Sequence, residues 1–146
     1  MTPDQISLVR QTMTWVQPRR QEFAADFYRR LFAADPGLEG MFSTDPVIQQ
    51  EKFVDELTAI VAAISDFPAF LLRAGALGVR HVNYQVRAEH YRVMREVLAA
   101  TFAAGFPQDW TAEHEQAWRS AYDMVAEAML LGRGRSADAP RAAWRP

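Results

Sequence analysis

One helical face in the middle of the chain is apolar until it ends in a histidine. Its members recur at intervals of four and three residues: Phe70, Ala74, Leu77 and His81. This spacing places them on one side of a helix, and Pro68 fits the first turn, where a missing N–H is tolerated. An imidazole on a buried face needs either a hydrogen-bond partner or a metal ion for its nitrogen. The spacing therefore predicts a helix that presents one chemically useful side chain to the interior.

The remaining long segments show the same helical spacing of apolar residues, and none alternates as a strand would. Two helix starts are marked by a capping residue followed by proline, at Thr2-Pro3 and at Asp45-Pro46. Pro36-Gly37 and Gly105 mark helix ends. We expect an all-α protein of six helices, the last of which ends near Gly132.

Composition narrows the class of protein. The 146 residues are enough for one domain, and 49% hydrophobic against 23% charged residues is the balance of a globular protein. A net charge of −2 does not favour nucleic acid, and no apolar run is long enough to cross a membrane. The absence of cysteine excludes disulfides, thiolate metal sites and a cysteine nucleophile. Because no secretory signal pattern is visible, we expect the protein in the cytoplasm.

The last fourteen residues differ from the rest. Residues 133–146 contain four arginines against one aspartate and are otherwise rich in alanine. A charged end of this kind is usually solvated. We therefore expect one domain over residues 1–132 and a basic, disordered tail over residues 133–146.

Two more polar side chains are expected near the interior. Tyr28 adjoins Phe27 close to the apolar stripe of the second helix, and Gln49 lies one turn before a phenylalanine on the inner face of the third. The other two histidines, His90 and His114, occur on helices without comparable apolar faces, so we expect them at the surface or at helix ends. The candidate interior polar groups are thus a phenol, an amide and an imidazole.

In this order and spacing, the chain resembles a globin over about residues 3–132. The narrower resemblance is to bacterial single-domain haemoglobins and to the haem domain of flavohaemoglobins. The residues that carry it are, in chain order, Phe27-Tyr28, Phe42, Gln49, Lys52-Phe53, the bend from His81 to Val86, and Glu89-His90-Tyr91. The resemblance implies a globin fold, three helices packed on three, around a haem b group.

The resemblance also implies a role for each matching residue. His81 would give a neutral ring nitrogen to the iron as the proximal ligand, and Tyr28 and Gln49 would be the distal hydrogen-bond donors. The other residues expected around the haem are Phe42, Phe53, Lys52, Leu77, Val86 and Tyr91. Gln50 is an alternative distal amide, since a one-residue shift would put Val54 in the place of Phe53.

These roles predict reversible binding of O2 at ferrous iron, with NO and CO as further ligands. Donors near the polar ligand O2 favour it over CO, so oxygen binding should be tight and its release slow. The implied activity is the conversion of nitric oxide to nitrate, with electrons from a separate reductase. The competing interpretations are a haem-based gas sensor or oxygen-storage protein without turnover, and a helical bundle that binds no haem.

One position departs from the flavohaemoglobin pattern. In that family the proximal histidine is linked to a tyrosine and a glutamate, which makes the ligand more basic. Tyr91 matches the tyrosine, but the glutamate position, eleven residues after Tyr122, holds Arg133. Unless Glu127 or another acid takes its place, we do not expect peroxidase-like activity.

Overall fold

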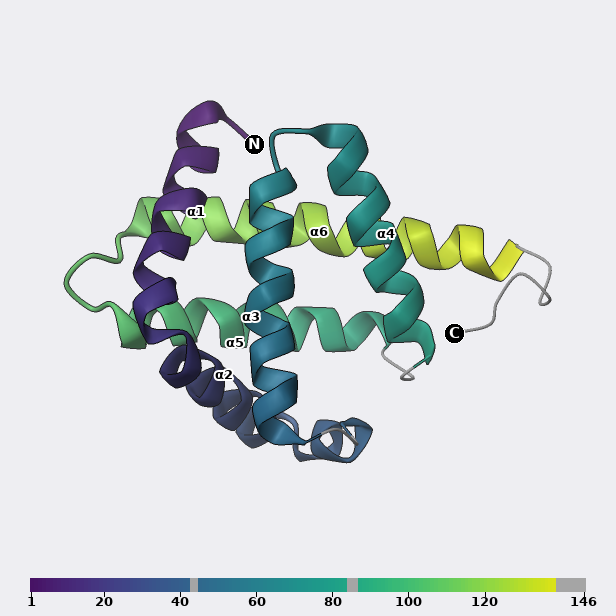
Figure 1. The fold of residues 1–146 in the computed structure, drawn as a ribbon, viewed down its shortest axis with the longest axis horizontal. Coiled ribbons are helices and arrows are strands. Elements are labelled where there is room, and N and C mark those ends of the chain that lie inside the picture. The colour runs from purple at the N-terminus through teal and green to yellow at the C-terminus, as the bar shows by residue number, and fades with distance from the viewer. Residues whose placement is uncertain (43–44, 84–86, 139–146) are drawn as a thin grey trace.

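Six α-helices and two short 3-10 helices make up the residues that the computed structural model describes, 1–42, 45–83 and 87–138 (Figure 1). In chain order they are α1 (Pro3–Val16), η1 (Gln17–Arg19), α2 (Arg20–Ala34), η2 (Pro36–Met41), α3 (Pro46–Ala63), α4 (Phe67–Asn83), α5 (Ala88–Gly105) and α6 (Ala112–Asp138). No strand occurs among these residues, so the predicted all-α class is confirmed. Over the same ranges, no helix is both long and apolar enough to span a membrane.

Both predicted helix starts are capped as their sequences indicate. The Thr2 hydroxyl accepts a hydrogen bond from the Gln5 backbone N–H at 3.1 Å, and the Gln5 side chain accepts one from the Thr2 N–H at 3.0 Å. The Asp45 carboxylate accepts from the backbone N–H groups of Val47 and Ile48. These bonds occupy donors that have no partner within the first helical turn.

The last helix extends further than predicted. The backbone of α6 stays helical through Asp138, six residues beyond Gly132. A glycine inside a helix costs only about 1 kcal/mol relative to alanine, and the alanine and arginines that follow are good helix formers. The predicted helix end near Gly132 is therefore wrong, and the rest of the predicted tail, residues 139–146, falls outside the described part of the chain.

The helices form two crossing layers. Helices α1, α3 and α4 run across α5 and α6, and the short turn between α3 and α4 makes these two helices antiparallel neighbours (Figure 1). Helix α2 packs against both α3 and α5 and so closes one end of the arrangement. From their shared turn, α3 and α4 diverge toward the end that carries Gln49 on α3 and His81 on α4 (Figure 1).

Aromatic side chains fill the space between the layers. Phe27, Phe70 and Phe102 are fully buried, and the ring of Phe102 packs between Phe23 at 4.9 Å and Trp118 at 4.5 Å, measured between ring centroids. Burying one phenylalanine side chain contributes roughly 1.5–3 kcal/mol to folding. This packed centre holds in place the helices that carry the candidate site.

His114 is buried, which differs from the expectation of an exposed histidine. It lies in the first turn of α6, where Nδ1 is 2.7 Å from the Thr111 hydroxyl and Nε2 is 2.9 Å from the Gln11 side-chain oxygen. The ring also packs 5.0 Å from Trp15. His114 is thus at a helix end, as predicted, but it connects α6 to α1 in the interior.

Helices α4 and α6 cross at Gly78, where their backbones touch. A Cβ atom added at Gly78 would overlap the backbone carbonyl group of Met129. We therefore expect Gly78→Ala to force the two helices apart and to lower the free energy of unfolding by about 2–3 kcal/mol, as overpacked core substitutions do. Urea denaturation of the haem-free protein measures this change.

Gly105 supplies the matched control. It ends α5, and a Cβ atom there would meet nothing within 4 Å. Gly105→Ala should leave stability unchanged or raise it by up to about 1 kcal/mol. Equal effects of the two substitutions would contradict the close crossing at Gly78.

Candidate functional site

Tyr28 on α2 and Gln49 on α3 form a polar pair that faces the interior. The Gln49 Nε2 amide donates a hydrogen bond of 3.1 Å to the phenolic oxygen of Tyr28. Because the phenol accepts this bond, its own O–H proton stays free to donate to another molecule. Burial raises the pKa of Tyr28 to about 12, so the phenol remains a neutral donor at physiological pH.

Four phenylalanines surround the Tyr28 ring, and two of them, Phe42 and Phe53, belong to the predicted site. Phe42 lies edge-on to the Tyr28 ring, with ring centroids 5.5 Å apart, and Phe53 does the same at 5.6 Å. Phe53 is fixed in turn by stacking on Phe27 at 4.3 Å. Both Phe42 and Phe53 are only half-buried, so apolar surface beside the phenol remains available for contact. The hydroxyl of Tyr28 therefore sits in a largely apolar setting, where a hydrogen bond is stronger than in water.

His81 near the C-terminal end of α4 has one nitrogen fixed and one nitrogen free. Its Nδ1 atom is 2.8 Å from the Leu77 backbone carbonyl, which can only accept, so Nδ1 carries the proton. Among the described residues Nε2 has no hydrogen-bond partner. Burial lowers the pKa of His81 below its ordinary value of 6.5, which keeps the ring neutral. A neutral imidazole with a free Nε2 is the form that binds a metal ion.

The residues present fit a haem group. The diverging ends of α3 and α4 carry half-buried apolar side chains, Phe53 and Leu57 on α3 and Leu77 on α4. A flat, apolar macrocycle would cover this surface, and His81 would supply the one axial nitrogen. The donor pair of Tyr28 and Gln49 would lie on the other side of the macrocycle. The structure thus brings together Tyr28, Phe42, Gln49 and Phe53, with Leu77 beside His81.

The remaining predicted site residues lie in different surroundings. Lys52 is exposed on α3, and Val86 falls outside the described residues. Gln50 points toward α2, where it lines a groove with Arg20 and Gln21, so it does not share the Tyr28 side of α3. Of the two glutamines, Gln49 is the one in contact with the phenol.

Tyr91 lies near His81, and Tyr122 lies near Tyr91. Tyr91 on α5 is buried, with its ring centroid 6.4 Å from that of His81. Tyr122 on α6 is nearby, and burial raises the pKa of its phenol. These two residues add bulk beside His81.

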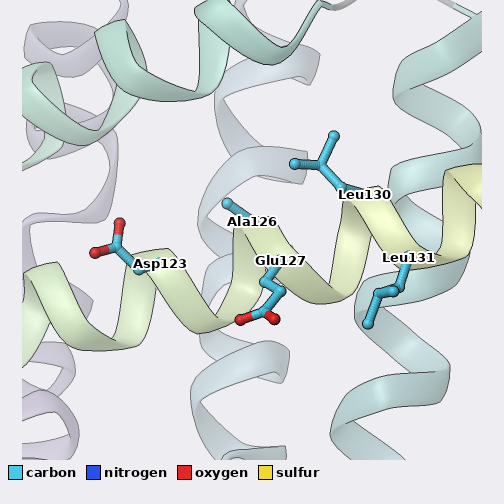
Figure 2. Close-up of a pocket in the computed structure, with 5 residues that line it drawn as sticks. All are labelled: Asp123, Ala126, Glu127, Leu130 and Leu131. Carbon is cyan, nitrogen blue, oxygen red and sulfur yellow. The ribbon is translucent and has the colours of Figure 1, made fainter.

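Glu127 does not take the place of the glutamate expected after Tyr122. Glu127 is exposed and, with Asp123, Ala126, Leu130 and Leu131, lines a shallow hollow on the outside of α6 (Figure 2). The group that accepts from His81 Nδ1 is the neutral carbonyl of Leu77. The side chain at position 133 falls outside the described residues. A neutral acceptor makes the imidazole a weaker electron donor than a carboxylate would.

Sequence reasoning missed the Leu77 carbonyl as the partner that orients His81. The contact spans four residues of one helix, so helical spacing alone could have suggested it. It also missed Glu56, whose carboxylate lies between two arginines of α4. The signal for that residue was weak because its partners are 17 and 24 positions away in the chain.

The two helical layers thus carry a half-buried imidazole on α4 and a phenol–amide pair on α2 and α3. The Globin family model matches residues 25–129. The chain belongs to the globin family. Membership supports binding of haem and of small gaseous ligands in general.

Relatives of two kinds are similar to this chain. A flavohemoprotein of Chromobacterium violaceum is 28% identical over 96% of this chain and 37% of its own length. An anaerobic nitrite reductase of Physcomitrium patens is 27% identical over 82% of this chain and 75% of its own length. An anaerobic nitrite reductase of Casuarina glauca is 24% identical over 89% of this chain and 91% of its own length. The chain thus spans about a third of the flavohemoproteins and most of the plant proteins.

Proposed function

We propose that the protein binds haem b through His81 and holds dioxygen reversibly under the Tyr28–Gln49 pair. The observation that carries the proposal is the hydrogen bond from Gln49 to the Tyr28 oxygen, which leaves the phenolic proton free to donate. When bound, ferrous haem supplies an open coordination position for a diatomic ligand. The proposed ligands are O2, NO and CO.

Each residue of the proposed site has a separate task. Tyr28 donates its proton toward dioxygen, which is the polar ligand, while Gln49 orients the phenol. Phe42 and Phe53 keep water away from that bond, which strengthens it. The Leu77 carbonyl holds Nδ1 of His81, so that Nε2 would be left to bind the iron. Oxygen should therefore be bound tightly and released slowly.

The proposed activity is nitric oxide dioxygenation. Nitric oxide and dioxygen combine to nitrate, and each turnover consumes one electron, which a separate reductase would supply. Support comes from the similarity to flavohemoproteins and from the protonated phenol at the distal side. Protein and reductase would share the cytoplasm, the location expected from the sequence.

Rapid mixing of the oxygenated protein with nitric oxide, followed by steady-state turnover with a reductase, tests this activity. Sustained nitrate formation over many equivalents is the expected result. Nitrate formation that stops at one equivalent, with a reductase that does reduce the protein, would contradict it.

A role in oxygen storage or gas sensing without turnover is the second candidate. The neutral acceptor at His81 Nδ1 favours it, because a carboxylate there would be the better arrangement for redox chemistry. The single-equivalent outcome in the mixing experiment would support this candidate instead.

Substitution of the two neighbouring glutamines should separate their roles. Gln49→Leu removes the bond that orients Tyr28, so we expect oxygen dissociation to become about 3–10 times faster, the effect of one neutral hydrogen bond. Gln50→Leu changes a residue in the groove beside Arg20, and the rate should stay within about twofold. Stopped-flow displacement of oxygen by CO measures both rates. A larger effect at Gln50 would indicate that Gln50, and not Gln49, is the distal amide.

A further inference from the structure

Glu56 on α3 lies between two arginines of α4. Its Oε2 atom accepts a hydrogen bond of 3.1 Å from Arg73 Nη2, and its Oε1 atom is 3.7 Å from Arg80 Nη2. Arg73 and Arg80 are seven residues apart, so they lie on the same face of α4, two turns from each other. One carboxylate therefore connects α3 to two points along α4.

The surroundings of Glu56 make this connection stronger than an ordinary surface ion pair. Its side chain is 22% exposed, against 48% for Arg73 and 53% for Arg80. Oε1 is fully buried and has no hydrogen-bond partner. Such an oxygen is costly unless a positive charge lies close by, and Arg80 is the charge that faces it. Movement of α4 away from α3 would separate this oxygen from the charge of Arg80.

Glu56 also lies on α3 between Gln49 and the turn that joins α3 to α4. It follows Gln49 by seven residues on α3, and Arg80 directly precedes His81 on α4. The two helices meet at the turn after α3 and diverge toward Gln49 and His81 (Figure 1). A link partway along them limits how far they open.

We propose that Glu56 is a positioning residue. Its carboxylate, shared by Arg73 and Arg80, sets the separation of α4 from α3 and so holds His81 at a fixed distance from the Tyr28–Gln49 pair. The proposal rests on the proposed function in taking His81 as the haem ligand. Its structural part, the restraint on α4, does not need haem.

The test compares Glu56→Gln with Glu96→Gln. The first removes the charge and keeps the shape of the side chain. The second is the matched control, because Glu96 accepts two hydrogen bonds from Arg119, at 2.7 and 2.9 Å, and joins α5 to α6 away from the site. Three quantities are measured: hydrogen exchange of the α4 amides in the haem-free protein, the rate of haemin loss, and the iron–histidine stretching band of the ferrous protein.

For Glu56→Gln we expect faster exchange of the α4 amides, and haemin to be lost about 10 times faster, the lower end of the effect of residues that orient a metal ligand. The iron–histidine band should shift or broaden. None of the three should change in Glu96→Gln. Arg80→Gln should reproduce the effect of Glu56→Gln, and the double variant should add little to either, because the two groups act as a pair.

Two outcomes would overturn the proposal. One is that Glu56→Gln leaves α4 exchange and the iron–histidine band as they are in the control. The other is that both variants accelerate exchange equally throughout the protein, which would indicate a general loss of stability. If the unmodified protein binds no haem, the proposed function fails, while exchange in the haem-free protein still decides whether Glu56 restrains α4.

Discussion

His81→Gly is expected to lower the affinity for haem by more than about 100-fold, the largest effect of any single substitution at this site. The reason is that His81 carries the proposed ligand nitrogen, Nε2, on a ring whose Nδ1 is held by the Leu77 carbonyl. Competition for haemin with a second haem-binding protein measures the affinity. Glycine also leaves a space the size of an imidazole ring, so added imidazole should restore the ferrous spectrum of a histidine-bound haem.

His90→Gly is the control for that experiment. His90 is the other histidine near the proximal side, and its Nδ1 accepts a hydrogen bond of 2.9 Å from the Arg87 backbone N–H at the start of α5. Its loss should weaken the helix start without changing the haem spectrum. Unchanged haem affinity in His81→Gly would contradict the assignment of His81 as the ligand. An equal loss of haem affinity in His90→Gly would contradict it as well.

Tyr28→Phe is expected to speed the dissociation of oxygen by about 10- to 100-fold. Bound dioxygen carries partial negative charge, and a hydrogen bond to a charged group is worth about 1.5–3 kcal/mol, where each 1.4 kcal/mol is a factor of ten. The phenol can provide this bond at all ordinary pH values because burial raises its pKa to about 12. Carbon monoxide carries little charge, so its dissociation rate should change much less.

Tyr122→Phe separates this effect from the simple loss of a buried hydroxyl. Tyr122 is another tyrosine with little exposure, but it lies on α6 beside Tyr91. The oxygen dissociation rate of the Tyr122→Phe protein should stay within about twofold of that of the unmodified protein. Stopped-flow measurements on both variants provide the comparison. Equal acceleration in the two, or an unchanged rate in Tyr28→Phe, would contradict direct donation from Tyr28.

The helices and their caps could be predicted because their signals are local. Thr2 with Gln5, and Asp45 before Pro46, are recognisable within four residues of sequence, and both caps form as expected. The inward direction of Gln49 also followed from helical spacing. In contrast, the end of α6 was placed six residues too early, because a glycine that can end a helix can also continue one at modest cost.

Contacts between distant segments could not be predicted in this way. The partner of buried His114 is Gln11, 103 residues away, and nothing in the sequence near His114 indicates it. The contacts of Glu56 with Arg73 and Arg80 likewise depend on the angle between α3 and α4. That angle results from packing between helices, such as the crossing of α4 and α6 at Gly78. Resemblance to a family predicts the residues of a haem site, whereas it gives no information on contacts particular to this chain.

Titration of the purified, haem-free protein with haemin tests most directly whether a porphyrin lies between α3 and α4 with His81 as its ligand. We predict a sharp endpoint at about one equivalent, a Soret band, and, after reduction and addition of CO, the spectrum of a haem with one axial histidine. A gradual rise without an endpoint, together with a ferrous–CO spectrum unchanged in His81→Gly, would contradict the proposed site.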